Sequence, residues 1–521
     1  MLALAVPMQA PLAQVRLPAL GESATEDFTP GMERRLGDQI MASIRRDPDY
    51  LDDPVLLESL QALWLPLVAA ARQRGDITPD TDLLFAWEAF LVRDRSVNAF
   101  ALPGGFVGVH LGLIAMTATR DELASVLAHE LSHVTQRHIA RGTVNSTRSS
   151  MIGLAALILG ILAASRTRNT DMANAAIMSG QAASIQGQLN FSRDMEREAD
   201  RVGFGVLASA GYAPGGMAAM FEKLDSANRI NDGSSFPYLR SHPLTVDRIS
   251  EARSRVLLPG GAAPAPPLRH ALMQARARVL MDTTAQSLQR IQEPLAGTAN
   301  GSAPLKDRLG ALYSGALAAS LLGDHVKARE AAIQAQRLLA GADPREPQAE
   351  RQIGLLQAEL ALQRGDARAA IQTLDALAVD AGTRAPMQLR AQAALDLQRQ
   401  EAGRNGPELR ASVESLQAWV AENKQDAPAW RLLAATAEAS GMPLRALRAE
   451  AEARAAVGDI GGAIDRLRAG QIAAKGGAGH DFIEASVIDL RLRELQAQRR
   501  QMVLEARGGR STGDESQSPP Q

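Results

Sequence analysis

The stretch that decides the fold is Leu127-Ala128-His129-Glu130-Leu131-Ser132-His133, which reads His-Glu-x-x-His inside an apolar, helix-favouring run. On a helix, residues four apart lie on one face, so His129 and His133 can direct their imidazoles at one point. Glu130 lies one step round the helix, beside that point. Two neutral imidazoles that hold Zn²⁺, next to a carboxylate that can take a proton from water, are the parts needed for metal-assisted peptide hydrolysis. We therefore expect a zinc site here; the alternative is two surface histidines that match the pattern by accident.

A third protein ligand is needed, and the chain has no cysteine to supply it. The next helix-favouring stretch, FSRDMEREADRVGFGVLA at residues 191–208, offers three carboxylates. Glu196 and Asp200 are four apart and share a face, whereas Glu198 points elsewhere. One of the pair can bind the metal while the other hydrogen-bonds a ligand imidazole. A solvated charged helix surface is the alternative, but the upstream His-Glu-x-x-His favours the ligand.

Two more histidines lie near these stretches. We expect one helix over residues 120–141, which places His138 nine residues after His129 on roughly the opposite face of the helix and disfavours it as a ligand. His242, in Ser241-His242-Pro243, is either a turn residue or a group that faces the zinc.

Residues 83–92 and 99–110 change from helical to strand-like patterning. A strand over segment 98–105, which ends in Pro-Gly-Gly, can lie open along the edge of a sheet. Proteases commonly hold an extended substrate by main-chain hydrogen bonds to such an edge. The candidate substrate-binding residues are Asn98, Ala99, Phe100, Gly104 and Gly105. A plain hairpin turn is the alternative.

Composition and punctuation divide the chain into several parts. The 521 residues carry 56 basic and 58 acidic side chains. The chain thus lacks the excess of basic residues that would indicate nucleic acid as a partner. We expect residues 1–25 to be a leader, either the remnant of a secretory signal without its basic region or an ordinary leader. A first domain spans residues 26–258, a Pro/Gly-rich linker 259–268, a helical repeat domain 269–505 and a disordered tail 506–521.

The apolar run MIGLAALILGILAA at residues 151–164 is shorter than the roughly 20 residues that cross a bilayer. It fits a buried or lid-like hairpin, or a segment inserted in the membrane interface.

The second half repeats a helical pattern followed by Gly-Asp and then Ala, as at Gly323-Asp324, Gly365-Asp366 and Gly458-Asp459. Glycine at the turn and alanine at the helix crossing are what tetratricopeptide-like hairpins require. A generic helical array without a binding groove is the alternative.

Four segments together carry a family resemblance: segment 98–105, LASVLAHELSHVTQRHIAR (123–141), EREADRVG (196–203) and SHPLTVDR (241–248). With them the chain resembles the zinc metallopeptidase family that includes HtpX and the CAAX-prenyl peptidases. The resemblance implies one Zn²⁺ per chain, bound by His129, His133 and Glu196. It also implies Glu130 as general base, Asp200 hydrogen-bonded to a ligand, and Arg248 beside the site. His242 would occupy the fourth zinc position until a substrate or partner displaces it.

The expected fold is mainly α with a small β-sheet: a zincin-type metallopeptidase domain followed by an α-solenoid of tetratricopeptide-like hairpins. The resemblance implies a periplasmic zinc endopeptidase and chaperone that handles unfolded or misassembled outer-membrane proteins. The repeat half would recruit the outer-membrane assembly machinery, with peripheral contact to the membrane and no nucleic acid. The alternative is mainly a repeat-based binding factor with little proteolysis. A purely structural zinc domain is disfavoured, because Glu130 would have no purpose between two structural ligands.

Overall fold

The computed structural model describes residues 28–142, 192–230, 237–256, 268–293, 302–377, 383–401, 406–475 and 481–508. The leader 1–25 and the apolar run 151–164 lie outside the described residues, as do nearly all of the linker 259–268 and most of the tail 506–521.

The first part of the chain combines helices with a small sheet. Its elements are α1 (Pro30–Ile44), β1 (Tyr50–Leu51), α2 (Pro54–Arg74), α3 (Pro79–Leu84), β2 (Glu88–Val92), β3 (Ala99–Leu102), β4 (Phe106–His110), α4 (Leu111–Met116), α5 (Arg120–Thr135), α6 (His138–Gly142), α10 (Arg193–Ser209), α11 (Gly215–Ile230), α12 (Pro237–Ser241) and α13 (Val246–Val256).

The sheet has the strand order β1-β2-β4-β3, with β2 and β4 parallel and the two outer strands antiparallel to their neighbours. Successive side chains alternate between its faces. Phe90 and Val92 pack under α1, whereas Ala89 and Leu91 join the larger core that contains α2 and α5. The sheet is therefore covered on both faces, and β3 forms one of its edges.

The second part of the chain is entirely helical in its described residues. Its elements are α14 (Leu268–Leu280), α15 (Ala285–Gln292), α17 (Leu305–Leu321), α18 (His325–Ala340), α19 (Pro347–Gln363), α20 (Ala367–Ala376), α21 (Arg384–Gln400), α22 (Pro407–Glu422), α23 (Ala427–Ala439), α24 (Pro443–Ala456), α25 (Ile460–Lys475) and α26 (Phe482–Gly508). The expected fold class, mainly α with a small sheet and a helical solenoid, is confirmed.

The turns of this array explain the Gly-Asp pattern. Gly323 and Gly365 have φ of +82° and +79°, a backbone conformation that favours glycine, and each ends one helix of a hairpin. The aspartate that follows caps the next helix: the Asp324 carboxylate accepts from Lys327 N and that of Asp366 from Ala369 N. The repeated dipeptide thus ends one helix and starts the next.

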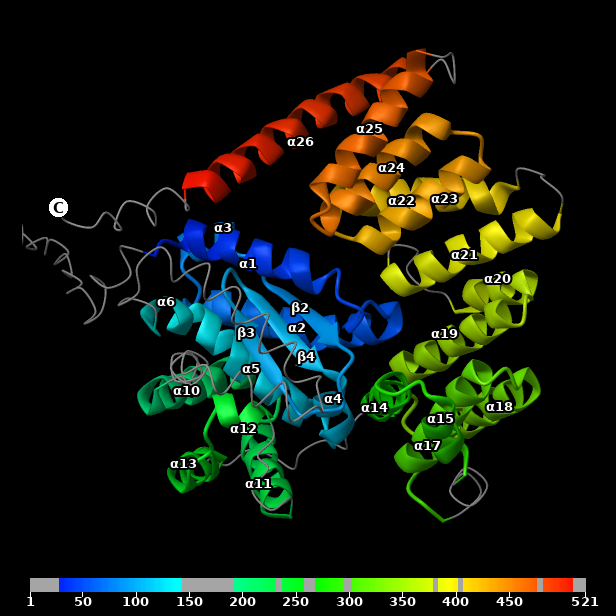
Figure 1. Ribbon diagram of the computed structural model, residues 1–521. Helices are drawn as coiled ribbons and strands as arrows, with labels where there is room; N and C mark the ends of the chain where they lie inside the picture. Colours follow the sequence, from blue (N-terminus) through cyan, green and yellow to red (C-terminus); the bar gives the residue numbers. More distant parts are fainter. Residues whose placement is uncertain are drawn as a thin grey trace, which may run out of the picture.

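The array curves around the first part of the chain, and α26 runs back toward α3 (Figure 1). Arginines on three of its helices form ion pairs with acids in and just before α2. These pairs are Arg276–Asp53 at 2.5 Å, Arg351–Glu58 at 2.8 Å and Arg384–Asp52 at 2.5 Å. At the far end of the array, Arg45 Nη1 donates to the carbonyl of Ala456. The two parts are therefore packed against each other at both ends of the array.

A buried histidine lies at the junction of α14 with the loop that follows α4. His270 Nε2 is 3.2 Å from the carbonyl oxygen of Thr117 and is 4 % exposed. Burial lowers the pKa of His270 to about 4, although the hydrogen bond to Thr117 opposes this shift. The junction thus holds a neutral imidazole.

Of the described helices, α2 alone has the length and apolar composition of a membrane span. Its residues Leu60, Trp64 and Leu67 are fully buried in the core with α5 and the sheet. Its apolar character is accounted for by this packing.

Candidate active site

Helix α5 carries the His-Glu-x-x-His motif through the centre of the first part. Thr119 caps it by accepting from Glu122 N, and Asp121 and Glu122 in its first turn complement the helix dipole. Every residue from Glu122 to Val134 is buried. Helix α10 crosses it closely at Gly203, where an added Cβ would lie 3.1 Å from the carbonyl oxygen of Ala128. This close approach brings the acids of α10 up to the histidines of α5.

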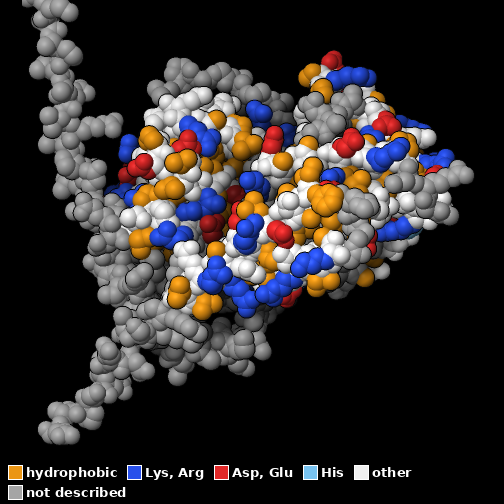
Figure 2. Space-filling model, turned by 90° about the horizontal axis from the view of Figure 1, so that it is seen from above, with side chains coloured by type: hydrophobic (Ala, Val, Ile, Leu, Met, Phe, Trp, Pro, Cys, Tyr) orange, Lys and Arg blue, Asp and Glu red, His pale blue; other side chains and the backbone are white. Residues whose placement is uncertain are grey.

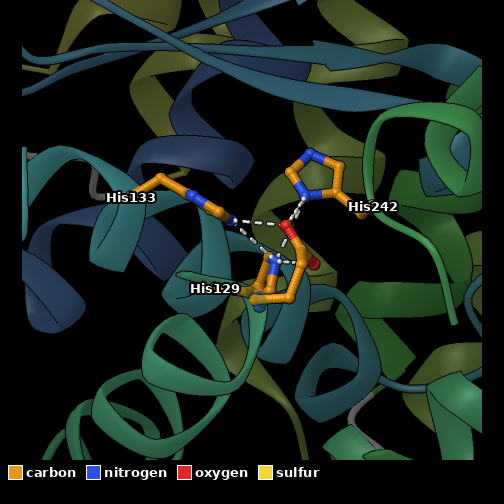
Figure 3. A group of neighbouring side chains, drawn as sticks. His129, His133 and His242 are labelled. Carbon is orange, nitrogen blue, oxygen red and sulfur yellow. Dashed lines mark hydrogen bonds and ion pairs between the residues drawn. The ribbon is translucent and has the colours of Figure 1, made fainter. Parts of the chain in front are cut away.

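Four side chains from three segments converge on one point. Each of His129, His133, Glu196 and His242 offers a ligand atom, and these atoms lie within 4.8 Å of one another. The three imidazoles direct ring nitrogens toward a common centre (Figure 3). Nε2 of His133 is 3.0 Å from Nε2 of His129 and 3.4 Å from a carboxylate oxygen of Glu196. All four residues, which we call the donor cluster, are at most 2 % exposed.

The charges of the donor set fit a cation. Burial disfavours a charged imidazole, but hydrogen bonds to Asp200 and Glu196 outweigh it and raise the pKa of His129 to about 10. Burial and the charge of His129 push the pKa of His133 well below its ordinary value. The carboxylates of Glu196 and Asp200 therefore stabilise positive charge at the centre of the cluster. Three nitrogens and a carboxylate with this spacing suit a divalent metal such as Zn²⁺.

Asp200 and Arg248 surround this centre rather than enter it. Asp200 Oδ1 is 2.9 Å from Nδ1 of His129, on the side of the ring away from the cluster. Arg248 binds Asp200 through Nε at 2.6 Å and Nη2 at 2.8 Å, and its Nη1 is 2.8 Å from Glu196. Despite burial, Arg248 and His129 hold the pKa of the Asp200 carboxyl below its usual value. Arg248 thus fixes both acids, one at the centre and one behind a ligand.

Glu130 is fully buried beside the cluster, yet neither of its carboxylate oxygens accepts a hydrogen bond from the described residues. A buried, unbonded carboxylate is costly, so such groups usually have a function. Nε2 of His242 lies 3.5 Å from Oε1 of Glu130, beyond close hydrogen-bond range. The carboxylate oxygens of Glu130 suit a group that exchanges a proton with water.

His242, the fourth member of the donor cluster, lies between the other three members and Glu130. Its Nδ1 is 3.0 Å from Glu196 Oε1, and its Nε2 faces Glu130. Tyr238 stacks on it with ring centroids 4.8 Å apart, and His242 N donates to the Tyr238 carbonyl. Sequence reasoning missed Tyr238; the only signal was an aromatic residue four positions before His242. His242 thus follows a short helix, as a turn residue would, and also faces the centre.

The segment expected to bind substrate forms β3 and the turn after it. His110 N donates to Asn98 O, which makes that pair and every second pair along β3 hydrogen-bonded. The N–H and C=O groups of Ala99 and Ala101 therefore point away from β4, but Ala99 is fully buried and only Ala101 of the two is partly exposed. Phe100 packs inward over Gly108 instead.

The two glycines of this segment have a different surrounding. At Gly104 an added Cβ would lie 2.8 Å from the Cα of Arg34, and at Gly105 2.9 Å from the Cβ of Phe85. Both have positive φ and are buried against neighbouring backbone. Their expected contact with substrate has no support in this geometry, because they build the turn.

The helix expected over residues 120–141 is interrupted, so that prediction is wrong in its C-terminal turn. Helix α5 ends at Thr135, Arg137 has φ of +51°, and α6 starts at His138. His138 is therefore turned back toward the site, with Nδ1 2.9 Å from Nδ1 of His133. Burial lowers its pKa to about 4, so it is neutral. It contacts a candidate ligand rather than joining the donor cluster.

Comparison with known proteins shows which family this part resembles. Residues 67–256 match the model of peptidase family M48. A putative beta-barrel assembly-enhancing protease of Vibrio cholerae is 37% identical over 278 residues, 53% of this chain and 55% of that protein. The beta-barrel assembly-enhancing protease of Escherichia coli K12 is 35% identical over 241 residues, 46% and 47% of the two chains. The mitochondrial metalloendopeptidase OMA1 of Schizosaccharomyces pombe is 33% identical over 163 residues, 31% and 44% of the two chains.

The chain spans about half the length of the assembly-enhancing proteases that it matches. The matched region nevertheless contains the whole donor cluster together with Glu130 and Arg248. Residues 67–256 therefore resemble peptidase family M48, and in that part the chain is similar to the beta-barrel assembly-enhancing proteases.

Proposed function

We propose that this chain is a zinc-dependent endopeptidase of the bacterial envelope that acts on unfolded or misassembled proteins. The observation that carries the proposal is one arrangement: His129, His133 and Glu196 converge on a point beside Glu130, a buried carboxylate with no hydrogen-bond donor among the described residues. Metal ligands with an adjacent free base are the parts of a hydrolytic site.

In this proposal His129, His133 and Glu196 hold Zn²⁺. When bound, Zn²⁺ acidifies water and polarises a peptide carbonyl. Glu130 takes the proton from the attacking water and passes it to the leaving amine. The Asp200 carboxylate, 2.9 Å from Nδ1 of His129, favours the tautomer with its hydrogen on that nitrogen, and Arg248 holds both α10 carboxylates in place.

The substrate lies in extended form along β3. The outward N–H and C=O groups of the partly exposed Ala101 provide main-chain pairing, which reads no side chain and so suits unfolded protein of varied sequence. Helix α5 packs against the same strand, so a bound peptide lies near Glu130.

His242 gates the site in this proposal. It fills the space between the proposed zinc ligands and Glu130, which a water molecule and the scissile carbonyl need for reaction. A substrate or partner that withdraws His242 would open the site.

Location and partners rest on the relatives. The names of the bacterial relatives concern beta-barrel assembly, which supports a place in the periplasm and outer-membrane proteins as clients. The helical array would recruit the assembly machinery.

A cavity of about 970 Å³ between the two parts favours the second candidate function, a binding factor with little proteolysis. It is lined by Tyr50 and Glu88 from the sheet side and by Arg351, Arg384 and Trp419 from the array. Basic, acidic and hydrophobic side chains intermix over the described surface seen from above, as Figure 2 shows.

The test is Glu130→Gln in the full chain. We expect unchanged zinc content and cleavage of casein slowed roughly 10²–10⁴-fold, because the base is lost while the ligands stay. Glu222→Gln, which removes an exposed carboxylate paired with Arg253, is the matched control and should cleave like the wild type. Full activity of Glu130→Gln would sink the proposed mechanism. An inactive variant that still supports client maturation in cells would favour the binding factor.

A further inference from the structure

We propose that His138 and Glu198 are positioning residues that fix the tautomer and direction of His133, through a hydrogen-bonded chain from carboxylate to imidazole to imidazole. The inference rests on the proposed function, in which Nε2 of His133 is a metal ligand. It gives a purpose to two buried or half-buried groups that the reaction itself does not use.

The backbone is built to place His138 there. A continued α5 would carry it away from His133, but the left-handed conformation of Arg137 ends the helix and turns the chain back. A non-glycine residue with φ of +51° is held by its surroundings. Here Arg137 Nε binds Glu33 Oε1 at 2.6 Å, and its Nη2 donates to the carbonyl of Phe28. Helix α1 thus anchors the turn that delivers His138.

The chain of contacts is continuous and largely buried. Nδ1 of His138 lies 2.9 Å from Nδ1 of His133, and its Nε2 lies 3.1 Å from Glu198 Oε2. Arg141 donates to the same Glu198 oxygen at 2.8 Å. The side chain of His138 is fully buried and that of Glu198 is 27 % exposed. The carboxylate of Glu198 is therefore held at the rim of the site, and the imidazole of His138 connects it by hydrogen bonds to His133.

The positions of the protons follow from these contacts. Nε2 of His133 faces the donor cluster and must keep its lone pair free to bind a cation. Its Nδ1 then carries the hydrogen and donates to Nδ1 of His138. His138 must accept there, so its own hydrogen is on Nε2 and is donated to Glu198. A single arrangement of tautomers satisfies these contacts among His133, His138 and Glu198, and it points the lone pair of His133 at the centre.

Helix α10 then supports the site with three acids. Glu196 enters the centre, Asp200 backs His129 directly, and Glu198 backs His133 through His138. Partners behind a metal-binding histidine typically change metal affinity or activity by about 10–100-fold. Both histidines of the motif are therefore supported from the same helix.

The test measures zinc and cobalt binding by the full chain, not activity. His138→Leu removes the acceptor, whereas His138→Asn keeps an oxygen close to the place of Nδ1. We expect zinc affinity, measured by competition with a chromophoric chelator, to fall about 10–100-fold in His138→Leu and to recover in large part in His138→Asn. The visible absorption spectrum of the Co²⁺-loaded protein should shift in the Leu variant and return toward wild type in the Asn variant. Circular dichroism of the metal-free proteins verifies folding.

Glu251→Gln, which changes an exposed carboxylate paired with Arg255, is the control and should bind zinc like the wild type. If His138→Leu does not fold, Glu198→Ala at the partly exposed end of the chain of contacts replaces it, with the same direction expected. Unchanged affinity and spectrum in the first variant that folds would overturn the inference, as would an equal loss in the Leu and Asn variants, which would indicate packing alone. Failure of the wild type to bind zinc would instead overturn the proposed function.

Discussion

Replacement of His242 by alanine tests whether the resting site is closed. In the structure His242 donates from Nδ1 to the charged carboxylate of Glu196 at 3.0 Å and stacks on Tyr238. Withdrawal of the ring must break these interactions before water and substrate can reach Glu130. We therefore expect His242→Ala to cleave faster than the wild type.

The size of the effect follows from the hydrogen bond between His242 and Glu196, which the alanine variant cannot form. A hydrogen bond to a charged group contributes about 1.5–3 kcal/mol. Since about 1.4 kcal/mol is a factor of ten in an equilibrium, the open fraction should rise roughly 10- to 100-fold. The rise in kcat/KM cannot exceed this increase in the open fraction, because only open molecules react.

The assay compares zinc content and casein cleavage of the wild type, His242→Ala and His325→Ala, which removes a histidine from α18 in the helical array. The control should match the wild type in both measurements. His242→Ala should keep zinc, because three ligands remain, and should cleave faster. If it keeps zinc but loses activity, His242 stabilises the transition state and the gating argument is refuted.

Three further predictions concern the junctions and the sheet edge. Arg276→Ala leaves Asp53 buried without its partner and should lower the free energy of unfolding by about 3–5 kcal/mol, seen as a lower unfolding midpoint. The control, Arg390→Ala at an exposed pair, should lower it by less than about 1 kcal/mol. The pKa of His270 is about 4 in the folded protein and about 6.5 in the unfolded chain, so the unfolded chain binds more protons between these pH values. The contribution of His270 to stability should therefore be full above pH 6.5 and fall by up to about 3 kcal/mol as the pH drops to 4. A His270→Gln variant with the same pH profile as the wild type would contradict this. Ala101→Pro removes an outward N–H of β3 without touching the β4 ladder, so KM for casein should rise with zinc content unchanged, and an unchanged KM would place the substrate elsewhere.

The sequence determined those parts of the protein that one helix or one turn can specify. The spacing of His129 and His133, and the shared face of Glu196 and Asp200, follow from the geometry of a single helix, which the backbone hydrogen bonds fix locally. The turns at Gly323 and Gly365 were readable for the same reason, because glycine tolerates a conformation that other residues avoid.

The tertiary structure decided what depends on interactions between distant residues. The packing of the folded chain places Glu196 at the centre and Asp200 behind His129. Arg248, about fifty residues later in the chain, binds both carboxylates and holds them in these places. The tertiary structure also reversed the direction of His138, because the left-handed turn at Arg137 is held by Glu33, 104 residues earlier. No periodic pattern carries such information: the energy that holds the turn comes from side chains that meet only after the chain has folded.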